Sequence, residues 1–225
     1  MTPWISLGVS QIPRSKDELA LWQRGDEFSI RVTGHDGDLM NSRMHHSEDR
    51  LAQLACAEIA DRSEPSVLIG GLGMGFTLRA ALDALPARVA VTVAELVPAV
   101  VDWNRGVLGE CAGHPLRDPR TSVVVDDIAR VLRSHKSSFD AILLDVDNGP
   151  DALTLRANSW LYSLEGLAAA SVSLRPRGVL AVWSVAPDAS FTARLERSGF
   201  DARAVTVRAR PGKGARHVVW VARRK

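Results

Sequence analysis

Short apolar runs alternate with longer amphipathic stretches from residue 66 onward. Runs rich in valine, isoleucine, leucine and alanine predict buried strands, and apolar residues three or four positions apart predict helices. The expected strands are Ser66–Gly70, Ala90–Ala94, Ser122–Val125, Ala141–Leu144 and Gly178–Trp183. The expected helices are Gly75–Leu85, Pro98–Leu108, Ile128–Ser134, Ser163–Leu174 and Phe191–Ser198. This order predicts an α/β fold with a doubly wound, mostly parallel sheet.

The first 45 residues follow a different pattern, which predicts a small β-hairpin region before a larger domain at 46–225. Glu27–Thr33 and Asp38–Arg43 have the composition of two strands, and the Asp36-Gly37 turn signal between them predicts a hairpin. The segment Ser15–Arg24 is expected to form one or two helical turns.

Two further elements frame the α/β domain. Apolar residues at helical spacing from Ser47 to Arg62 predict an amphipathic helix that Ser47 caps. Ala204–Arg208 and His217–Ala222 predict a closing hairpin, whose antiparallel strands are compatible with one edge of a mostly parallel sheet.

Length and composition are typical of one soluble globular protein. The chain has 225 residues, of which 46% are apolar and 24% charged, and no apolar run approaches the ~18 residues of a membrane span. The first residues lack the basic start and apolar core of an export signal, so we expect a cytoplasmic protein without membrane contact. Cys56 and Cys111 have no metal-ligand spacing and are expected to be reduced thiols.

Charge is distributed unevenly, although the net charge is only +2. No acidic residue follows Asp201, whereas the basic residues after it are Arg203, Arg208, Arg210, Lys213, Arg216, Arg223, Arg224 and Lys225. A basic end can bind nucleic acid or an acidic substrate. We favour a solubilised sheet edge, because edge strands are often guarded by Lys and Arg and no interleaved aromatic residues suggest base stacking. Nucleic acid is therefore not an expected partner.

A glycine-rich turn joins the first expected strand of the α/β domain to its helix. The glycines are Gly71, Gly73 and Gly75, and Glu95 follows twenty positions after the last of them, at the end of the next strand. Glycines let a ligand approach the backbone, and a carboxylate at this spacing receives ribose hydroxyls, so the two features together predict a bound nucleoside. The alternatives are a tight turn without a ligand and a solvated acid at a strand end.

Acidic residues also follow the third and fourth expected strands. Asp127 can accept a hydrogen bond from an adenine amino group, and Asp126 is expected to cap a helix or to face solvent. Asp145 ends the apolar run Ala141–Leu144, so we expect its half-buried carboxylate to orient an amine or to take its proton. The alternative for Asp145 is a helix cap or a loop brace.

Histidine and acidic residues cluster at the start of the first long helix, as His45, His46, Glu48 and Asp49. We expect no metal there, because adjacent residues at one helix end point in different directions and no second cluster has ligand spacing. His46 and Glu48 can instead line the mouth of a substrate site.

These motifs together resemble the spermidine synthase family, which lies within the class I S-adenosylmethionine methyltransferase fold. The similarity extends from about Gly37 to Trp183 and is carried by Gly71–Arg79, Val93–Pro98, Asp118–Asp127, Phe139–Asp145, Leu161–Ser163 and Leu174–Leu180. The Leu-Tyr-Ser element and the Thr-Leu-Arg after the glycine loop separate this family from generic methyltransferases. The resemblance implies a seven-stranded Rossmann-like methyltransferase sheet with the short hairpin extension at its N-terminus.

The resemblance also implies a site, in which Glu95 holds the ribose, Asp127 the adenine and Asp145 the attacking amine. The other residues expected to bind the donor are Gly71, Gly73, Met74, Gly75, Leu96 and Ile128. Those expected on the acceptor side are His46, Glu48, Asp147, Asn148 and Tyr162. The implied donor is S-adenosylmethionine or its decarboxylated form, which would leave as S-adenosylhomocysteine or methylthioadenosine.

The chain departs from the family at three acceptor-side positions. Met74 stands where the family has an aspartate that contacts the amine of the aminopropyl arm, and Ser47 aligns with a tyrosine. Asn148 replaces the second acid of the Asp-x-x-Asp-Pro signature, and Asp147 lies one residue early for the same role. These differences leave the nucleoside half of the site intact and change the polyamine half.

The expected activity is transfer of an aminopropyl group to a small-molecule amine, as in polyamine biosynthesis, by an enzyme that can form a homodimer. Methyl transfer from intact S-adenosylmethionine is the alternative that Met74 favours. Two further alternatives are a non-catalytic nucleoside-binding protein and a nucleic-acid methyltransferase that uses the basic end.

Overall fold

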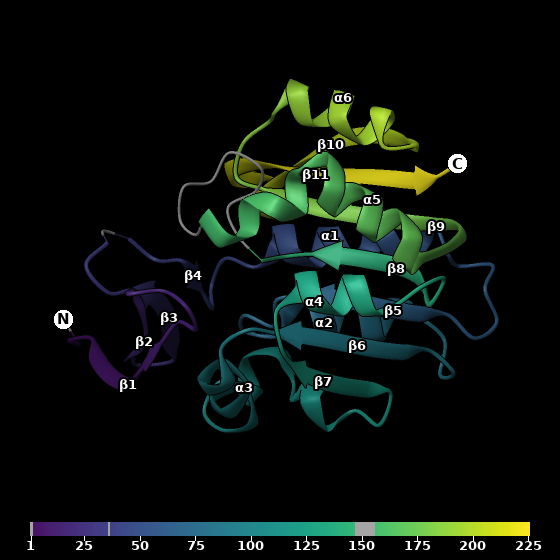
Figure 1. Ribbon diagram of the computed structural model, residues 1–225. Coiled ribbons are helices and arrows are strands. Elements are labelled where there is room, and N and C mark those ends of the chain that lie inside the picture. Colours follow the sequence, from purple (N-terminus) through teal and green to yellow (C-terminus); the bar gives the residue numbers. More distant parts are fainter. Residues whose placement is uncertain (1, 36, 147–155) are drawn as a thin grey trace.

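The computed structural model describes residues 2–35, 37–146 and 156–225, which form two β-sheets and the helices around the larger one (Figure 1). The larger sheet has seven strands in the order β10-β11-β9-β8-β5-β6-β7. Its parallel strands are β5 (Ser66–Gly70), β6 (Ala90–Glu95), β7 (Thr121–Val125), β8 (Phe139–Leu144) and β9 (Leu174–Ser184). The predicted doubly wound α/β fold is therefore confirmed.

Helices cover both faces of this sheet. They are α1 (His46–Ala57), α2 (Phe76–Ala84), α3 (Pro98–Arg105), α4 (Ile128–Ser134), α5 (Leu164–Ser173) and α6 (Ala189–Arg197). Short 3₁₀ helices lie at Gly109–Ala112, Pro115–Arg117 and Arg156–Tyr162. Val67 and Ile69 of β5 belong to the core that α1, α2 and α3 cover, whereas Leu68 belongs to the core beneath α4, α5 and α6. Burial on both faces explains why these strands are apolar throughout.

The chain ends in an antiparallel hairpin of β10 (Phe200–Arg210) and β11 (Lys213–Arg224). β11 pairs with β9, so β10 lies at the edge of the sheet. The predicted closing hairpin is confirmed, although both strands are longer than the apolar runs. Pairing continues from Val207 and His217 out to Arg210 and Lys213, because main-chain hydrogen bonds do not depend on apolar side chains.

The N-terminal sheet is an antiparallel meander of β1 (Ile5–Gln11), β2 (Glu18–Arg24), β3 (Glu27–Val32) and β4 (Met40–Asn41). The predicted hairpin is confirmed in β3 and β4, where Ser29 lies opposite Asn41. The predicted helical turns in Ser15–Arg24 are wrong. Leucine and alanine favour a helix locally, but β2 pairs with β1 on one side and β3 on the other, and this tertiary pairing overrides propensity.

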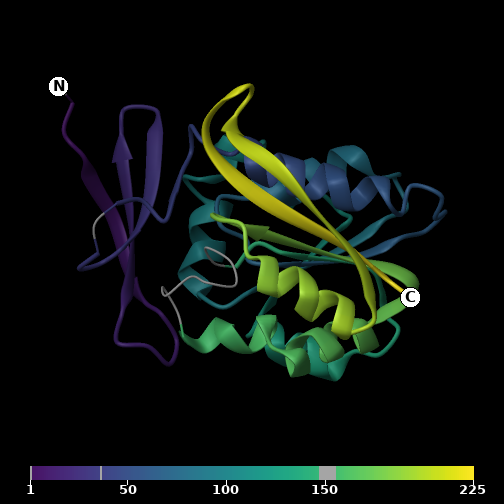
Figure 2. The same ribbon diagram turned by 90° about the horizontal axis from the view of Figure 1, so that it is seen from above.

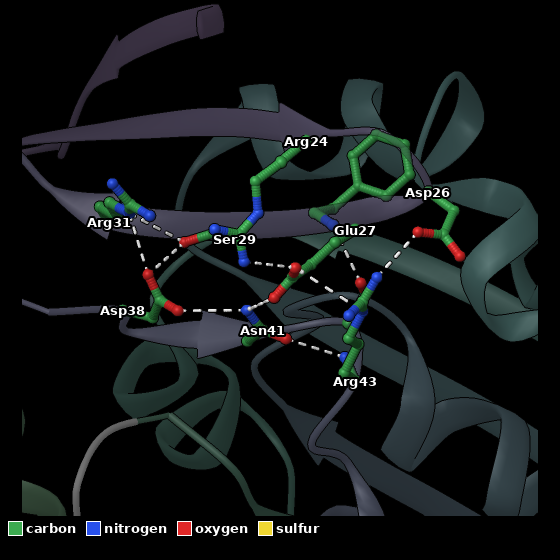
Figure 3. A network of polar contacts seen from close by, with 10 residues as sticks. Arg24, Asp26, Glu27, Ser29, Arg31, Asp38, Asn41 and Arg43 are labelled. Carbon is green, nitrogen blue, oxygen red and sulfur yellow. Dashed lines mark hydrogen bonds and ion pairs between the residues drawn. The ribbon is translucent and has the colours of Figure 1, made fainter. Parts of the chain in front are cut away.

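A polar network connects β2, β3 and β4 of the N-terminal sheet (Figure 3). Its centre is the buried Glu27 carboxylate, which accepts hydrogen bonds from Arg24 Nη2 and Asn41 Nδ2, each at 2.8 Å. The Arg24 guanidinium is the main cause that lowers the pKa of Glu27. A second ion pair, from Arg31 Nε to Asp38 Oδ1 at 2.9 Å, links β3 to the segment before β4.

The N-terminal sheet lies beside the carboxyl ends of the parallel strands (Figures 1 and 2). Its apolar side chains Leu19, Leu21, Ile30 and Val32 belong to the same core as β5 and β6. The carboxyl edge of the larger sheet is therefore enclosed between the two sheets, at the place where doubly wound sheets bind ligands. No helix in the described part of the chain is long and apolar enough to cross a membrane.

Candidate functional site

The glycine turn between β5 and α2 requires glycine for two physical reasons. Gly71, Gly73 and Gly75 have positive φ angles of 88°, 54° and 84°, a region that side chains rarely adopt. A Cβ on Gly71 would also lie 2.3 Å from the carbonyl oxygen of Asp145, which is too close for any side chain. The turn thus brings bare backbone to the carboxyl edge of the sheet, beside the residue that follows β8.

Asn104 of α3 holds this turn in place. Its Nδ2 donates to the Gly73 carbonyl at 2.8 Å and to the Val100 carbonyl at 2.9 Å, and the side chain is buried. Sequence reasoning missed Asn104. In the sequence, Asn104 is only a polar residue close to Val100 and Val101 on a helix. Its role is visible only when the structure places the glycine turn against this helix.

Glu95 connects the glycine turn to the start of α3. Its Oε2 accepts from the Leu72 N–H at 2.8 Å, and its Oε1 accepts from the Val97 N–H at 2.9 Å. Burial raises the pKa of Glu95, and these backbone hydrogen bonds act in the opposite direction. A carboxylate has about four lone-pair positions, so capacity remains for hydroxyl groups of a ligand in the cavity that Glu95 lines.

The first cavity lies between the carboxyl edge of the large sheet and the N-terminal sheet. It encloses about 840 Å³ of empty space with its open mouth included, which suits a nucleoside-sized ligand. Of the residues expected to bind the donor, those that line it are Gly71, Gly73, Glu95, Leu96, Asp127 and Ile128. The N-terminal region supplies an apolar wall of Ile12, Leu19, Ile30, Val32, Leu39 and Met40.

Asp127 caps α4, with its Oδ1 accepting from the Ala129 N–H at 2.9 Å. Of the two roles expected for Asp126, the helix cap is not observed, because its Oδ1 accepts from the Asp127 N–H instead. Asp126 lies at the surface and forms an ion pair with Arg130, which is the expected solvent-facing role. The cap fixes the orientation of Asp127 while its side chain stays 30% exposed at the rim of the first cavity.

A second cavity adjoins the first. The two share the lining residues Leu39, Met40, Gly73, Asp145 and Val146. The remaining residues that line the second cavity are Asn41, Glu48, Leu72, Met74, Phe76, Thr77 and Trp183. Asp145 thus lies where the two cavities meet, and Met74, predicted to face the donor, lies on the second cavity.

Asp145 and Glu48 form a pair of carboxyl groups in the second cavity. The Thr77 hydroxyl donates to Asp145 Oδ2 at 2.5 Å, and the Ser47 hydroxyl donates to Glu48 Oε2 at 2.6 Å. Burial raises the pKa of Asp145 to about 6 against the opposing hydrogen bond from Thr77. Burial, and then the charge of Asp145, raise the pKa of Glu48 to about 7. A cationic ligand such as an ammonium would favour the ionised form of both.

Ser47 does not cap α1, so that prediction is wrong. The helix begins at His46 with His45 at the N-cap, and no side chain caps it. Ser47 is buried within the first turn, where it holds Glu48 instead. His46 opens the helix but does not line either cavity.

The other predicted site residues have different outcomes. Tyr162 is buried in the core and packs edge-on against Phe191, with ring centroids 5.8 Å apart, and it lines neither cavity. Gly75 shapes the turn without lining a cavity. Asp147 and Asn148 lie outside the described residues. Within residues 2–35, 37–146 and 156–225, no group of three or more metal-ligating side chains comes together.

Sequence reasoning also missed Thr77. A threonine in the first turn of α2 has no local signal for function, although it lies within the Gly71–Arg79 segment that carries the family resemblance. Its hydroxyl meets Asp145 only because β5 and β8 are neighbours in the sheet.

The raised pKa of Glu48 predicts a pH-dependent stability effect. The folded state retains a proton that the unfolded state loses between its pKa of 4.5 and the folded value of about 7, so stability falls as pH rises through this window. Glu48→Gln removes the titratable group, and with it the cost of ionising this side chain in the folded state. We expect the variant to be more stable than the parent above pH 7, by on the order of 1 kcal/mol, and equally stable near pH 4.

Thermal unfolding from pH 4 to pH 8 measures this difference. Glu110→Gln, at an exposed position, is the matched control. A constant stability difference between the Glu48 variant and the parent across this range would show that Glu48 is not held protonated by its surroundings.

Comparison with known proteins finds relatives that carry one name. Polyamine aminopropyltransferase of Mycobacterium tuberculosis is 28% identical over 179 residues, which cover 78% of this chain and 32% of that protein. The protein of the same name from Leptospira biflexa is 33% identical over 130 residues, which cover 55% of this chain and 45% of that protein. The chain thus matches less than half the length of these curated relatives. No protein-family model matches it.

Solved structures show the same fold. Spermidine synthase from Thermotoga maritima has a TM-score of 0.76 at 20% identity and covers 98% of this chain and 73% of its own. The chain is similar in sequence to polyamine aminopropyltransferases and in fold to spermidine synthases. A spermidine synthase in complex with the transition-state analogue AdoDATO has a TM-score of 0.74 at 20% identity. The predicted methyltransferase-like fold is confirmed, together with the resemblance to the spermidine synthase family on which it was based.

Proposed function

We propose that the chain transfers an aminopropyl group from a decarboxylated S-adenosylmethionine-type sulfonium to an amine acceptor. The single observation that carries the proposal is the position of Asp145 at the junction of the two cavities. In this arrangement the first cavity takes the adenosyl group and the second takes the acceptor. The similarity to polyamine aminopropyltransferases supports transfer of an aminopropyl group.

The first cavity has the chemistry for the nucleoside. Glu95 offers carboxylate oxygens to ribose hydroxyls, and Asp127 offers an oxygen to the adenine amino group. Gly71 and Gly73 line this cavity together with Asp145, so the sulfur-bearing end would lie against their bare backbone. The apolar wall from the N-terminal sheet excludes water from this side.

The reaction is a displacement at the carbon attached to the sulfonium. A new bond forms between the acceptor nitrogen and the aminopropyl carbon, the carbon–sulfur bond breaks, and its electron pair stays on the sulfur of methylthioadenosine. This leaving group is a neutral thioether and requires no acid. The acceptor must lose a proton to become nucleophilic, and in this proposal the Asp145 and Glu48 pair, which lines the second cavity, receives it. Alignment in a dry cleft supplies much of the remaining catalysis.

Calorimetry with the intact and the decarboxylated donor side by side tests this proposal. The intact donor carries a carboxylate that Asp145 and Glu48 would repel, whereas the decarboxylated donor presents only its ammonium. We expect the decarboxylated form to bind at least about tenfold more tightly. If neither form binds, the proposed donor is wrong.

Methyl transfer from intact S-adenosylmethionine is the second candidate. Met74 favours it, because this buried side chain lines the second cavity where the resemblance implies an aspartate for the aminopropyl amine. Tighter binding of the intact donor, with methyl transfer to an amine, would establish this candidate in place of the first.

Putrescine is expected to be a poor acceptor. The two carboxyl groups of the second cavity, Asp145 and Glu48, interact with each other and thus serve the same end of a diamine. The other end would face uncharged side chains in the described part of this cavity, such as Asn41, Met74 and Trp183, and an ammonium without a carboxylate partner there is costly. We expect turnover well below about 1 per second with the decarboxylated donor.

Butylamine, which lacks the far ammonium, is the matched comparison and is expected to react at least as fast as putrescine. Product quantification by mass spectrometry measures both rates. Efficient spermidine formation from putrescine would contradict the prediction and would show that a second carboxylate reaches the far end.

A further inference from the structure

We propose that Arg14 is a positioning residue of the nucleoside site, which bridges the N-terminal sheet to Asp127 and closes the adenine end of the first cavity. The inference rests on the proposed function, because it takes this cavity to hold the adenosyl group. It assigns a role to the turn between β1 and β2, which the sequence motifs leave without one.

The bridge joins two parts of the chain that otherwise meet through apolar packing. Arg14 Nη1 lies 3.6 Å from Asp127 Oδ2, while Asp127 Oδ1 is held by the Ala129 N–H. The carboxylate therefore presents a fixed oxygen to the guanidinium. Among the ion pairs between described residues, this one alone connects the N-terminal sheet to the part of the chain from α1 to β11.

The turn that carries Arg14 is constrained by its own hydrogen bonds. Gln11 Nε2 donates to the carbonyls of Ser15 at 2.9 Å and Asp17 at 2.8 Å, and the Ile12 N–H donates to the same Asp17 carbonyl. Arg14 itself has a φ of 63°, a left-handed conformation that is uncommon for a residue with a side chain. A residue kept in such a conformation by its surroundings is often part of a functional site.

The same turn forms a wall of the cavity. Ile12, two positions before Arg14, is 2% exposed and lines the first cavity together with Ile128, the residue after Asp127. The turn thus inserts an apolar side chain into the cavity and places a cation beside Asp127, which lines the cavity. A nucleoside in the cavity would lie beneath this turn, so its release requires the pair to open.

The test is the rate at which 5′-methylthioadenosine dissociates from the full chain, measured by stopped-flow displacement. Arg14→Ala is expected to release the ligand about two- to fivefold faster, as fits a partly exposed ion pair. Lys16→Ala is the matched control, because Lys16 is exposed on the same turn and its substitution removes an equal charge. Methylthioadenosine is expected to dissociate from this control variant at the parent rate. Added salt should accelerate release from the parent and from Lys16→Ala but not from Arg14→Ala.

Arg14→Gly separates the effect of losing the charge from the effect of backbone strain at this position. Glycine adopts positive φ without strain, so this variant should fold at least as stably as the parent and still release the ligand as fast as Arg14→Ala. Parent-like dissociation from either Arg14 variant, or equal acceleration in Lys16→Ala, would overturn the inference. Failure of the parent to bind methylthioadenosine would instead contradict the proposed function, and this inference would be rejected with it.

Discussion

Replacing Asp145 by asparagine is expected to lower turnover at least about a thousandfold while affinity for methylthioadenosine stays within about threefold. Asparagine has nearly the same shape, so the side chain can still meet the Thr77 hydroxyl and fill the junction of the cavities. It cannot accept a proton from the acceptor amine, and it removes the negative charge that attracts an ammonium. The loss should therefore fall on turnover and on acceptor binding rather than on the nucleoside.

Steady-state rates with the best acceptor, and calorimetry with methylthioadenosine, measure the two effects of the Asp145 change. Asp126→Asn makes the same chemical change at a surface position that lines neither cavity, and it should retain parent activity. A parent-like rate for Asp145→Asn would mean that Asp145 only braces the loop after β8, which is the alternative that the sequence left open.

Replacing Glu95 by alanine is expected to weaken methylthioadenosine binding by about 1–3 kcal/mol, which is roughly five- to 150-fold. The change removes charge-assisted hydrogen bonds to ribose. It also leaves the N–H groups of Leu72 and Val97 without their carboxylate partner, so the glycine turn loses support and the protein loses stability.

Glu95→Gln separates these two effects. The amide keeps one acceptor oxygen for a backbone N–H and loses the charge, so it should unfold at a higher temperature than Glu95→Ala while still binding more weakly than the parent. Calorimetry and thermal unfolding on the same samples give both quantities. A dissociation constant equal to that of the parent in both variants would exclude Glu95 from the ligand site.

Predictions from the sequence were most accurate for elements whose pattern of buried side chains can be recognised within a short stretch of the chain. β5 and α4 begin and end at the residues that the apolar pattern predicted. A strand buried on both faces is a continuous apolar run, and a helix beside it has apolar residues on one side, so each is visible in a short window. The errors came where long-range pairing decides, as in β2, whose leucine and alanine residues favour a helix until β1 and β3 pair with it.

The sequence by itself determined that the glycine turn, Glu95, Asp127 and Asp145 would gather at one edge, because the carboxyl ends of parallel strands converge there. Only the tertiary structure decided which side chains complete that edge. Thr77 meets Asp145 across 68 positions, and Asn104 reaches the glycine turn across 31. Such contacts depend on the order of strands in the sheet and on the rotation of each helix against it. Periodicity within a single chain records neither, because it reports only which face of an element is buried and not which element covers it.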